Sequence, residues 1–256
     1  MMSVERALEG CRVVVTRDHP GELGRLLDER GAVVLHVPLI EITGPPDGGV
    51  ALRSALDELA RFDWLIVTSV AGAEAVGQAA NAHRELRLGA VGTATARRLA
   101  DLAGREVDLV PSRQLGASLA AKFVDAHRSE PRQRVLLALG DRAASTLHDE
   151  LGRAGHLVTT ATAYRTELRA LFDDDRTVIA DADAVLFASG SAAQSWAEAL
   201  GSDADRLLPA HVIAIGPSTA AVARQNGLKL TGVAADHSLA GLVNELNISW
   251  RSGVKG

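Results

Sequence analysis

Small and hydroxyl residues recur directly after short apolar runs of this sequence, and their types and positions suit them for binding an anion. If the runs form parallel strands, these residues lie at the carboxyl ends, where open α/β sheets bind their ligands. Several of them also stand where a helix would begin, so backbone N–H groups and positive helix-dipole ends would point at the same space. Such a surface suits carboxylates or phosphates. The groups are Thr16-Arg17, Thr68-Ser69, Gly92-Thr93, Gly140-Asp141, Ser189-Gly190-Ser191 and Gly216-Pro217-Ser218-Thr219.

Each of these residues also has a purely structural explanation. Ser and Thr are among the commonest helix N-caps, and capping alone accounts for any single one of them. Six such groups at the ends of strands are harder to explain by capping alone, so we expect them to line a binding surface. The candidate substrate-binding residues are Thr16, Arg17, Thr68, Ser69, Gly92, Thr93, Ser189, Ser191, Pro217, Ser218 and Thr219.

Two of the residues that could do chemistry stand out individually. Tyr164 is the sole tyrosine, and it lies in a segment that we expect to link two domains, where its phenol could face a cleft. Packing at a hinge is the alternative for Tyr164. Arg17 follows the first apolar run and could meet an anionic ligand there. The 27 basic residues include only 3 Lys, and therefore 24 Arg, so an ordinary surface role is the alternative for Arg17.

Signatures of cofactor and metal chemistry are absent from the sequence. No Gly-x-Gly-x-x-Gly follows an apolar run, no phosphate-loop lysine occurs, and no Gly-x-Ser-x-Gly nucleophile elbow is present. The eight histidines are scattered without metal-ligand spacing, so we expect them to be solvated or to cap helices. Cys11 stands at a strand entrance and is expected to pack there. The sequence therefore predicts a site without cofactor or metal.

Composition and charge narrow the class of protein. The 256 residues carry a net charge of −5 and include only 3 Trp, 4 Phe and 1 Tyr, which argues against a nucleic-acid surface and against aromatic stacking platforms. A single cysteine forms no internal disulfide and fits a reducing compartment. No apolar segment approaches the roughly 18–20 residues that span a bilayer, and the N-terminus has no signal-peptide pattern. We expect a soluble, cytoplasmic protein with a small-molecule substrate.

The chain contains an internal repeat of about 120 residues. The segments that begin at Arg12, Asp63 and Val91 have similar partners that begin at Arg134, Asp183 and Ile215, with offsets of 122, 120 and 124. This period is the size of a domain rather than of a solenoid repeat. We therefore expect two similar domains.

Within each copy, short apolar runs alternate with amphipathic segments. Residues 11–38 are typical of a complete βαβ unit, and residues 134–160 repeat the pattern. Runs that are apolar throughout indicate strands buried on both faces, hence parallel sheets covered by helices. The predicted fold class is therefore α/β, with two similar domains that each contain a parallel sheet flanked by helices. Further predicted strands are 64–68, 107–110, 184–188, 211–215 and 229–232.

Two segments at equivalent places in the repeat are candidates for the connection between the domains. If residues 39–43 and 162–168 pair as a two-stranded linker, one domain lies between them and the N-terminal βαβ unit joins the C-terminal half. A head-to-tail arrangement of the two copies is equally compatible with these patterns. Residues 249–256 are predicted to be a flexible tail, and they could begin a linker to a further domain.

The motifs together resemble the uroporphyrinogen-III synthase family. The likeness covers about residues 11–246 in the right order, and it implies an interleaved pair of domains: 1–38 with 167–248, then 42–163, joined by linker strands at 39–41 and 164–166. The residues that carry it are Val15-Thr-Arg17, Asp63-Trp-Leu-Ile-Val-Thr-Ser69, Val91-Gly-Thr-Ala-Thr-Ala96, Tyr164-Arg-Thr166 and Ala214-Ile-Gly-Pro-Ser-Thr-Ala220.

The resemblance implies a reaction. Such synthases take linear hydroxymethylbilane, remove its hydroxyl as water and close the ring while inverting the last pyrrole. The substrate carries eight carboxylates, which suits a surface of N–H groups and hydroxyls. Tyr164 matches the tyrosine of the family's motif, and the resemblance implies that its phenol hydrogen-bonds the leaving hydroxyl. A monomer without cofactor is implied as well.

Two departures from the family's pattern leave other functions open. The chain has Ala71 and Gly190 in motifs where the family often has Asn-Gly and Thr-Ser-Pro-Ser, which removes one amide and one hydroxyl from the inferred site. Contacts through backbone N–H groups would survive both changes. The alternative is a non-catalytic two-domain module of a regulatory protein that senses a tetrapyrrole or small anion. A nucleotide-dependent Rossmann enzyme is a third, for which the glycine fingerprint is missing.

Overall fold

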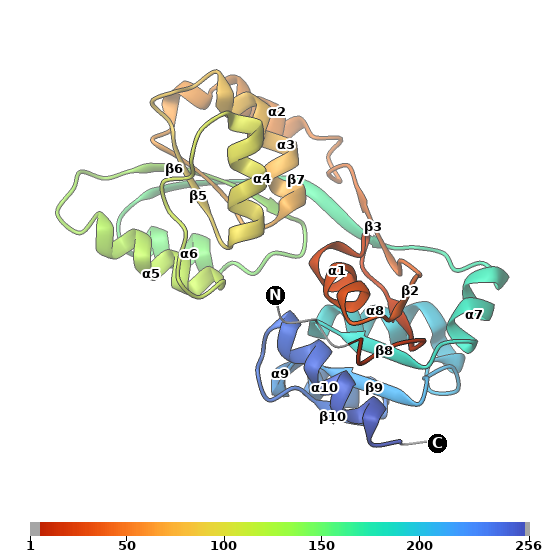
Figure 1. Ribbon diagram of the computed structural model, residues 1–256. Helices are drawn as coiled ribbons and strands as arrows, with labels where there is room; N and C mark the ends of the chain where they lie inside the picture. The colour runs from red at the N-terminus through yellow and green to blue at the C-terminus, as the bar shows by residue number, and fades with distance from the viewer. Residues whose placement is uncertain (1–5, 254–256) are drawn as a thin grey trace. The chain divides into compact units, whose positions relative to one another are not determined.

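The computed structural model describes residues 6–253 of the chain, which divide into two compact units (Figure 1). Unit 1 holds the described residues up to Glu41 and those from Glu167 onward, and unit 2 holds Ile42–Thr166. Both units are α/β, with helices on the two faces of a five-stranded sheet. The predicted fold class of parallel sheets flanked by helices is therefore confirmed.

Unit 1 contains a sheet with the strand order β10-β9-β8-β1-β2. Each of its neighbouring pairs is parallel. The elements of this unit are β1 (Arg12–Val15), α1 (Gly21–Glu29), β2 (Val33–His36), α7 (Asp173–Ala180), β8 (Ala184–Phe187), α8 (Gly190–Leu200), β9 (His211–Ala214), α9 (Pro217–Gln225), β10 (Gly232–Val233) and α10 (Leu239–Arg251), with a 3-10 turn at Gly201–Asp203.

Unit 2 contains a sheet with the strand order β3-β7-β6-β4-β5. The pairs β7–β6, β6–β4 and β4–β5 are parallel. The chain passes from one unit to the other within β3 and again within β7, which are neighbours in the sheet. The elements are β3 (Ile40–Thr43), α2 (Val50–Asp57), β4 (Trp64–Val67), α3 (Val70–Asn81), β5 (Arg87–Ala90), α4 (Thr93–Ala103), α5 (Gly116–Ala126), β6 (Arg134–Gly140), α6 (Thr146–Arg153) and β7 (Leu157–Leu168), with a 3-10 turn at Leu59–Arg61.

The central strands are apolar along their runs because both of their faces are covered. In β1, Val13 and Val15 pack with α1 and α10, whereas Val14 packs on the opposite face with Trp196 of α8. Successive side chains of β4 alternate between the two faces of the sheet in the same way: Leu65 and Val67 face α3 and α4, whereas Ile66 faces α5. This packing is why the runs showed no polar alternation in the sequence.

One predicted strand is absent from the structure and another is displaced. Residues 107–110 form no strand; Leu109 makes only an isolated bridge to Gly89. The strand of that region is β5, which was missed because Arg87 and Gly89 interrupt its apolar run. In unit 1 the predicted strand at 229–232 is instead the two-residue β10.

The predicted flexible tail is also corrected by the structure. Helix α10 continues to Arg251, because Ser249 Oγ lies 2.7 Å from Nδ1 of the buried His211 and the Trp250 ring packs on the same imidazole. These contacts hold the last helical turn on unit 1. Residues 254–256 of the predicted tail lie outside the described residues.

Three histidines are buried rather than solvated, although one of them, His127, caps the C-terminus of α5, as the sequence allowed. His127 stacks on Phe123 and donates from Nδ1 to the Phe123 carbonyl at 2.7 Å. His156 accepts from the Gln133 N–H at 3.2 Å, and burial lowers its pKa. Burial also lowers the pKa of His211. Because a lowered pKa favours the neutral ring, His156 and His211 behave as packing groups of the core.

Membrane-spanning helices and metal-binding clusters are both absent from the described residues. None of the helices between residues 6 and 253 has the length and apolar character needed to cross a bilayer. The same part of the chain holds no group of three or more His, Cys, Asp or Glu side chains placed to bind a metal ion.

The contact between α3 and α4 provides a test of the packing. A Cβ on Gly77 would lie 2.5 Å from Leu102 Cβ, so we predict that Gly77→Ala lowers the free energy of unfolding by about 1–3 kcal/mol through overpacking. Gly152 in α6 is the matched control, because a Cβ there meets nothing within 4 Å. Gly152→Ala should be neutral or stabilising by up to about 1 kcal/mol. Urea unfolding of both variants checks this, and equal effects would contradict the packing.

Candidate functional site

Four helices begin directly after strands at the carboxyl edges of the two sheets. In unit 2, α3 and α4 follow β4 and β5; in unit 1, α8 and α9 follow β8 and β9. The first-turn N–H groups of a helix have no partner within the helix, and they carry its positive dipole end. Each carboxyl edge therefore presents two helix N-termini, which is the arrangement expected from the repeat.

The predicted candidates Ser69 and Ser189 act as N-caps. Ser69 Oγ accepts from the Gly72 N–H at 3.0 Å, and Ser189 Oγ accepts from the Ala192 N–H at 3.2 Å. The Ser189 hydroxyl also lies 2.9 Å from the Ser191 hydroxyl. Capping therefore uses the serine oxygens, and the remaining first-turn N–H groups are the donors available to a ligand.

Helices α4 and α9 begin differently, without a side-chain cap. Their N-cap residues are Gly92 and Gly216. Thr93 is the first residue of α4, and Pro217 occupies the first position of α9, where its missing N–H costs no hydrogen bond. The side chains of Thr93 and Ser218 are exposed at these N-termini.

The remaining candidates of unit 1 divide into exposed and buried residues. Thr16 and Thr219 are 5% and 4% exposed, so their side chains pack inside the protein at the edge of the sheet and do not form part of a surface that could bind a ligand. Arg17 is exposed, and its backbone carbonyl accepts from Nε2 of His36 at 2.9 Å. Its guanidinium has no ion-pair partner among residues 6–253 and is available to an anion.

Tyr164 lies within β7, and its ring packs on the last residue of β6. The register shifts between Leu139 and Gly140, which places Gly140 opposite Tyr164. A Cβ on Gly140 would lie 2.6 Å from Tyr164 Cζ and 2.7 Å from the phenol oxygen. Only glycine therefore permits this position of the ring. The Asp141 N–H donates to the Tyr164 carbonyl at 3.0 Å, and the Asp141 carboxylate accepts from the Thr166 N–H at 3.0 Å.

The phenol ring shares a face of the unit 2 sheet with the N-terminus of α3. Tyr164 packs against the same core cluster as Ala73 of α3 and Ala138 of β6. A Cβ on Gly72 would lie 3.1 Å from the Ala138 carbonyl oxygen, so the first turn of α3 lies close to β6 just before Gly140. A phenol and a set of backbone donors thus occur together at one carboxyl edge.

The candidates therefore fall into two sets, one at the carboxyl edge of each unit. Two polar residues that the sequence analysis did not select, Gln114 and His237, accompany them: their side chains pack against Gly92 and Gly216 respectively. The only signal of them in the sequence is their equivalent position in the repeat. The unit 2 set is Thr68, Ser69, Gly92, Thr93 and Tyr164, and the unit 1 set is Thr16, Arg17, Ser189, Ser191, Pro217, Ser218 and Thr219.

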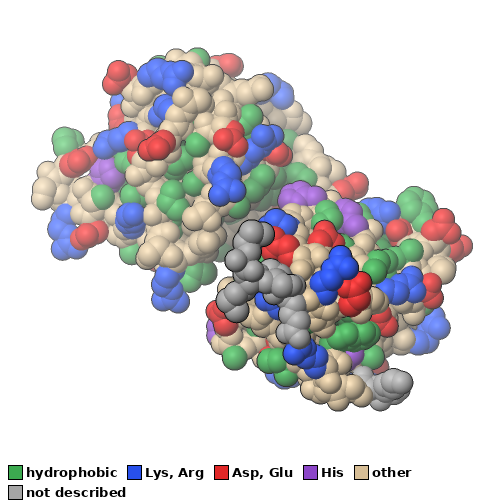
Figure 2. Space-filling view, in the orientation of Figure 1, with side chains coloured by type: hydrophobic (Ala, Val, Ile, Leu, Met, Phe, Trp, Pro, Cys, Tyr) green, Lys and Arg blue, Asp and Glu red, His purple; other side chains and the backbone are tan. Residues whose placement is uncertain are grey.

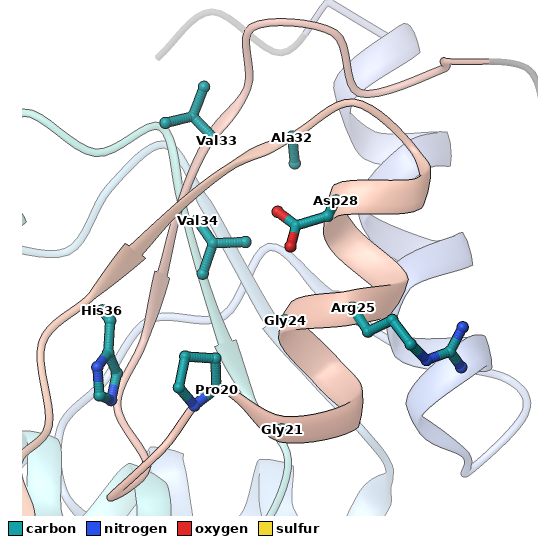
Figure 3. Close-up of a pocket in the computed structure, with 9 residues that line it drawn as sticks. All are labelled: Pro20, Gly21, Gly24, Arg25, Asp28, Ala32, Val33, Val34 and His36. Carbon is teal, nitrogen blue, oxygen red and sulfur yellow. The ribbon is translucent and has the colours of Figure 1, made fainter.

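Two surface hollows lie elsewhere. One, of about 660 Å³, runs between α1 and the edge strand β2, with Asp28 and the apolar Val33 and Val34 among its lining residues (Figure 3). The other, of about 380 Å³, lies beside His127 and His156, next to the N-terminal ends of β6 and β7. Neither hollow includes a candidate residue.

On the face drawn in Figure 2, acidic and basic side chains are intermixed over both units, so attraction of an anion depends on local donors.

Cys11 provides no nucleophile. Its side chain is fully buried in the core of unit 1, in accordance with the expected packing role. Burial, reinforced by the Asp183 carboxylate, raises the pKa of the thiol to about 12. The thiol therefore stays protonated and unreactive at neutral pH.

Comparisons with known proteins give one consistent result. The family model described as "Uroporphyrinogen-III synthase HemD" matches residues 21–244. The uroporphyrinogen-III synthase of Synechococcus elongatus is 25% identical over 255 residues, which covers 93% of this chain and 95% of that protein.

Solved structures agree in fold. The uroporphyrinogen-III synthetase of Helicobacter pylori has a TM-score of 0.64 at 17% identity, covering 94% of this chain and all of that one. A mutant uroporphyrinogen III synthase of the extremely thermophilic bacterium Thermus thermophilus has a TM-score of 0.57 at 19% identity, covering 95% of this chain and all of that one. At these identities the likeness shows the fold alone.

The N-caps provide a test of the site's construction. We predict that Ser69→Ala and Ser189→Ala each lower the free energy of unfolding by about 1 kcal/mol, because each leaves a first-turn N–H without its acceptor. Ser112, exposed in the loop before α5, is the control, and Ser112→Ala should change stability by less than about 0.5 kcal/mol. Urea unfolding measures all three. Cap variants that unfold like the control would show that these hydroxyls do not cap.

Proposed function

Since the chain belongs to the uroporphyrinogen-III synthase family and is a hydro-lyase of that family, we propose that it takes linear hydroxymethylbilane, removes the hydroxyl as water and closes the ring with the last pyrrole inverted. The observation that carries this is the family match over residues 21–244, which spans both units. The alternative of a non-catalytic sensing module is not favoured by that match or by the relatives described above. We further propose a cytoplasmic monomer, which fits the single buried thiol.

The domain arrangement that we propose is the interleaved one. Residues 1–38 and 167–248 form one domain, residues 42–163 form the other, and 39–41 and 164–166 are the linker strands; residues 1–5 of this division lie outside the described residues. The grouping of contacts into two units supports this proposal, since the divisions fall after Glu41 and after Thr166. The adjacency of β3 and β7 in one sheet supports it as well.

The substrate's carboxylates are bound by helix N-termini. Hydroxymethylbilane carries eight carboxylates, and the protein's net charge of −5 repels them at long range, so binding needs local positive groups. The first turns of α3, α4, α8 and α9 supply backbone N–H donors, and the exposed Arg17 supplies a guanidinium. Ala71 and Gly190, where the chain departs from the family's pattern, lie within the first turns of α3 and α8. Their N–H groups remain, so the substitutions leave this mode of binding intact.

Tyr164 assists departure of the hydroxyl. Loss of that hydroxyl as water gives an azafulvene, which the substituted carbon of the last pyrrole attacks to form a spiro intermediate. A phenol O–H that donates to the leaving oxygen stabilises the charge that develops there. The contact with Gly140 fixes the ring, so the hydroxyl needs little reorganisation. The protein's other task is to hold the bilane folded, because free closure through the unsubstituted α-position gives the type I isomer.

The proposed function is tested by isomer analysis. Hydroxymethylbilane generated in situ is incubated with the protein, and uroporphyrinogens are oxidised and separated as types I and III. We expect type III well above a no-protein control. Type I alone, from protein shown to be folded by circular dichroism, would overturn the enzyme assignment.

We predict that Tyr164→Phe lowers kcat by about 10- to 100-fold with little change in KM or thermal stability. Phenylalanine keeps the ring on Gly140 and removes only the hydroxyl. Gly140→Ala is the companion variant: it displaces the ring, so it should lower kcat as well, with the tyrosine still present. Turnover within twofold of wild type in Tyr164→Phe would exclude the hydroxyl from the reaction.

A further inference from the structure

The hollow of about 380 Å³ in unit 2 contains a histidine nitrogen that the protein leaves unused. His156 lines this hollow, is only 8% exposed and directly precedes β7. Its Nδ1 accepts from the Gln133 N–H at 3.2 Å, so in the neutral ring the proton lies on Nε2. Within residues 6–253 this Nε2–H has no hydrogen-bond acceptor. Unlike the indole N–H of Trp64, which is buried without a partner, it is open to solvent. A directed donor therefore faces the hollow.

The protonation of His156 determines what kind of ligand it suits. Burial, with smaller contributions from His127 and Arg132, lowers the pKa of the imidazole, so the ring is neutral at pH 7. A neutral ring whose Nδ1 is occupied by Gln133 presents an N–H to the hollow, whereas a metal ion needs a nitrogen lone pair. The hollow therefore suits an oxygen acceptor and not a metal ion.

The fold itself does not require a histidine at this position. The equivalent residue of unit 1 is Ala32. Each of the two residues donates its backbone N–H to a carbonyl five positions earlier, at 3.1 Å for Ala32 and 3.2 Å for His156. Each also follows a glycine of positive φ, Gly31 or Gly155. A methyl group thus occupies in unit 1 the place that the imidazole occupies in unit 2, so the donor is an addition specific to unit 2.

Most of the charged side chains around the hollow are already paired. The Glu130 carboxylate lies 3.7 Å from the Arg87 guanidinium and 3.8 Å from Nε2 of the buried His127. Arg128 pairs with Asp125 at 3.1 Å. These groups therefore balance one another and leave little net charge for a ligand.

Arg132 is the exception. It lines the hollow, is exposed and makes no hydrogen bond or ion pair within the described part of the chain, and it lies near enough to His156 to influence the imidazole. One guanidinium and one neutral N–H match a single carboxylate, with an oxygen for each donor. A dianion would meet Glu130 in the same hollow. Val124 and Ala154 supply apolar wall for the rest of the ligand.

We propose that this hollow binds a small organic monocarboxylate, one oxygen of which accepts from His156 Nε2–H while the other accepts from the Arg132 guanidinium. The hollow lies beside the residues that precede β6 and β7, at the amino edge of the unit 2 sheet. The candidate residues of unit 2 lie at the carboxyl edge. The site is therefore a second one, and it goes beyond the proposed function.

Butyrate is the probe, and the backbone amide of Gly155, which lines the hollow, reports its binding in NMR spectra of the whole protein. We expect a saturable shift with a Kd on the order of 1–10 mM. Butyramide has the same shape without the charge and should give no saturable shift. Equal shifts by the two compounds, or no saturation by butyrate below about 50 mM, would overturn the proposal.

Two variants each remove one donor. His156→Asn keeps an acceptor for the Gln133 N–H, because the asparagine oxygen takes the place of Nδ1, and it deletes Nε2–H. Arg132→Gln removes the guanidinium from an exposed position. Each should weaken butyrate binding by about tenfold. Arg153→Gln is the control, since it removes the same charge from an exposed residue at the end of α6 that does not line the hollow; its Kd should stay within twofold of wild type. If Arg132→Gln binds butyrate as this control does, the assignment is wrong.

The imidazole provides an independent readout. A bound carboxylate favours the charged imidazolium, so butyrate should raise the pKa of His156 and bind more tightly as the pH falls. The other charged or titratable side chains that line the hollow are His127, Arg128, Glu130 and Arg132. The Cε1–H resonance of His156 itself, assigned by its loss in His156→Asn, follows the titration. A pKa that butyrate leaves unchanged would contradict the contact with Nε2.

Inorganic phosphate tests the charge of the ligand. At pH 8, where phosphate is a dianion, it should bind more weakly than butyrate, because Glu130 opposes the second charge. Tighter binding of phosphate would overturn the assignment to a monocarboxylate. None of these measurements requires turnover, so their failure leaves the proposed function standing, and failure of the isomer assay leaves this site standing.

Discussion

Parallel pairing of the strands is the constraint on which the rest of the molecule depends. Each pair whose register is described runs parallel, so each crossover helix must return the chain and the next strand must end at the same edge as the last. Helices that follow strands then begin at that edge. The concentration of backbone N–H donors at the carboxyl edges is therefore a result of the strand topology. The side chains at these edges are left to orient the ligand and to discriminate between ligands.

The second constraint on the structure is the close approach of side chains to the backbone of three glycines. Gly140 admits the Tyr164 ring, and Gly92 and Gly216 admit Gln114 and His237. In none of these three glycines is a left-handed backbone involved. Each glycine instead lacks the Cβ that would collide with the side chain packed on it. The Tyr164 ring, packed on backbone, has fewer orientations than a ring in solvent, which lowers the entropy lost when it meets a ligand.

The sequence patterns predicted those strands that are buried on both faces. Strands β1, β4, β8 and β9 were found because their runs are buried on both faces. Strand β5 was missed because Arg87 and Gly89 contribute little apolar surface, and α10 was ended too early because its last turn depends on His211, 38 residues before Ser249. Ser69 and Ser189 were identifiable as caps from local sequence alone. Gln114 and His237 were not, since each meets its glycine across more than 20 residues and an extended glycine has no local signature.

The passage of the chain through β3 and β7 has a consequence for the order in which the protein folds during synthesis. Strand β1 lies between β2 and β8, and the Arg12 N–H donates to the carboxylate of Asp183, 171 residues later. Unit 2 is contiguous from Ile42 to Thr166 and has all its strands once β7 has left the ribosome. The βαβ segment at the N-terminus, by contrast, must wait with one edge of β1 unpaired until β8 emerges. Early exposure of that apolar edge leaves it open to mispairing and aggregation. Once unit 2 has folded, β3 and β7 are neighbours in its sheet, which shortens the loop that separates β1 from β8.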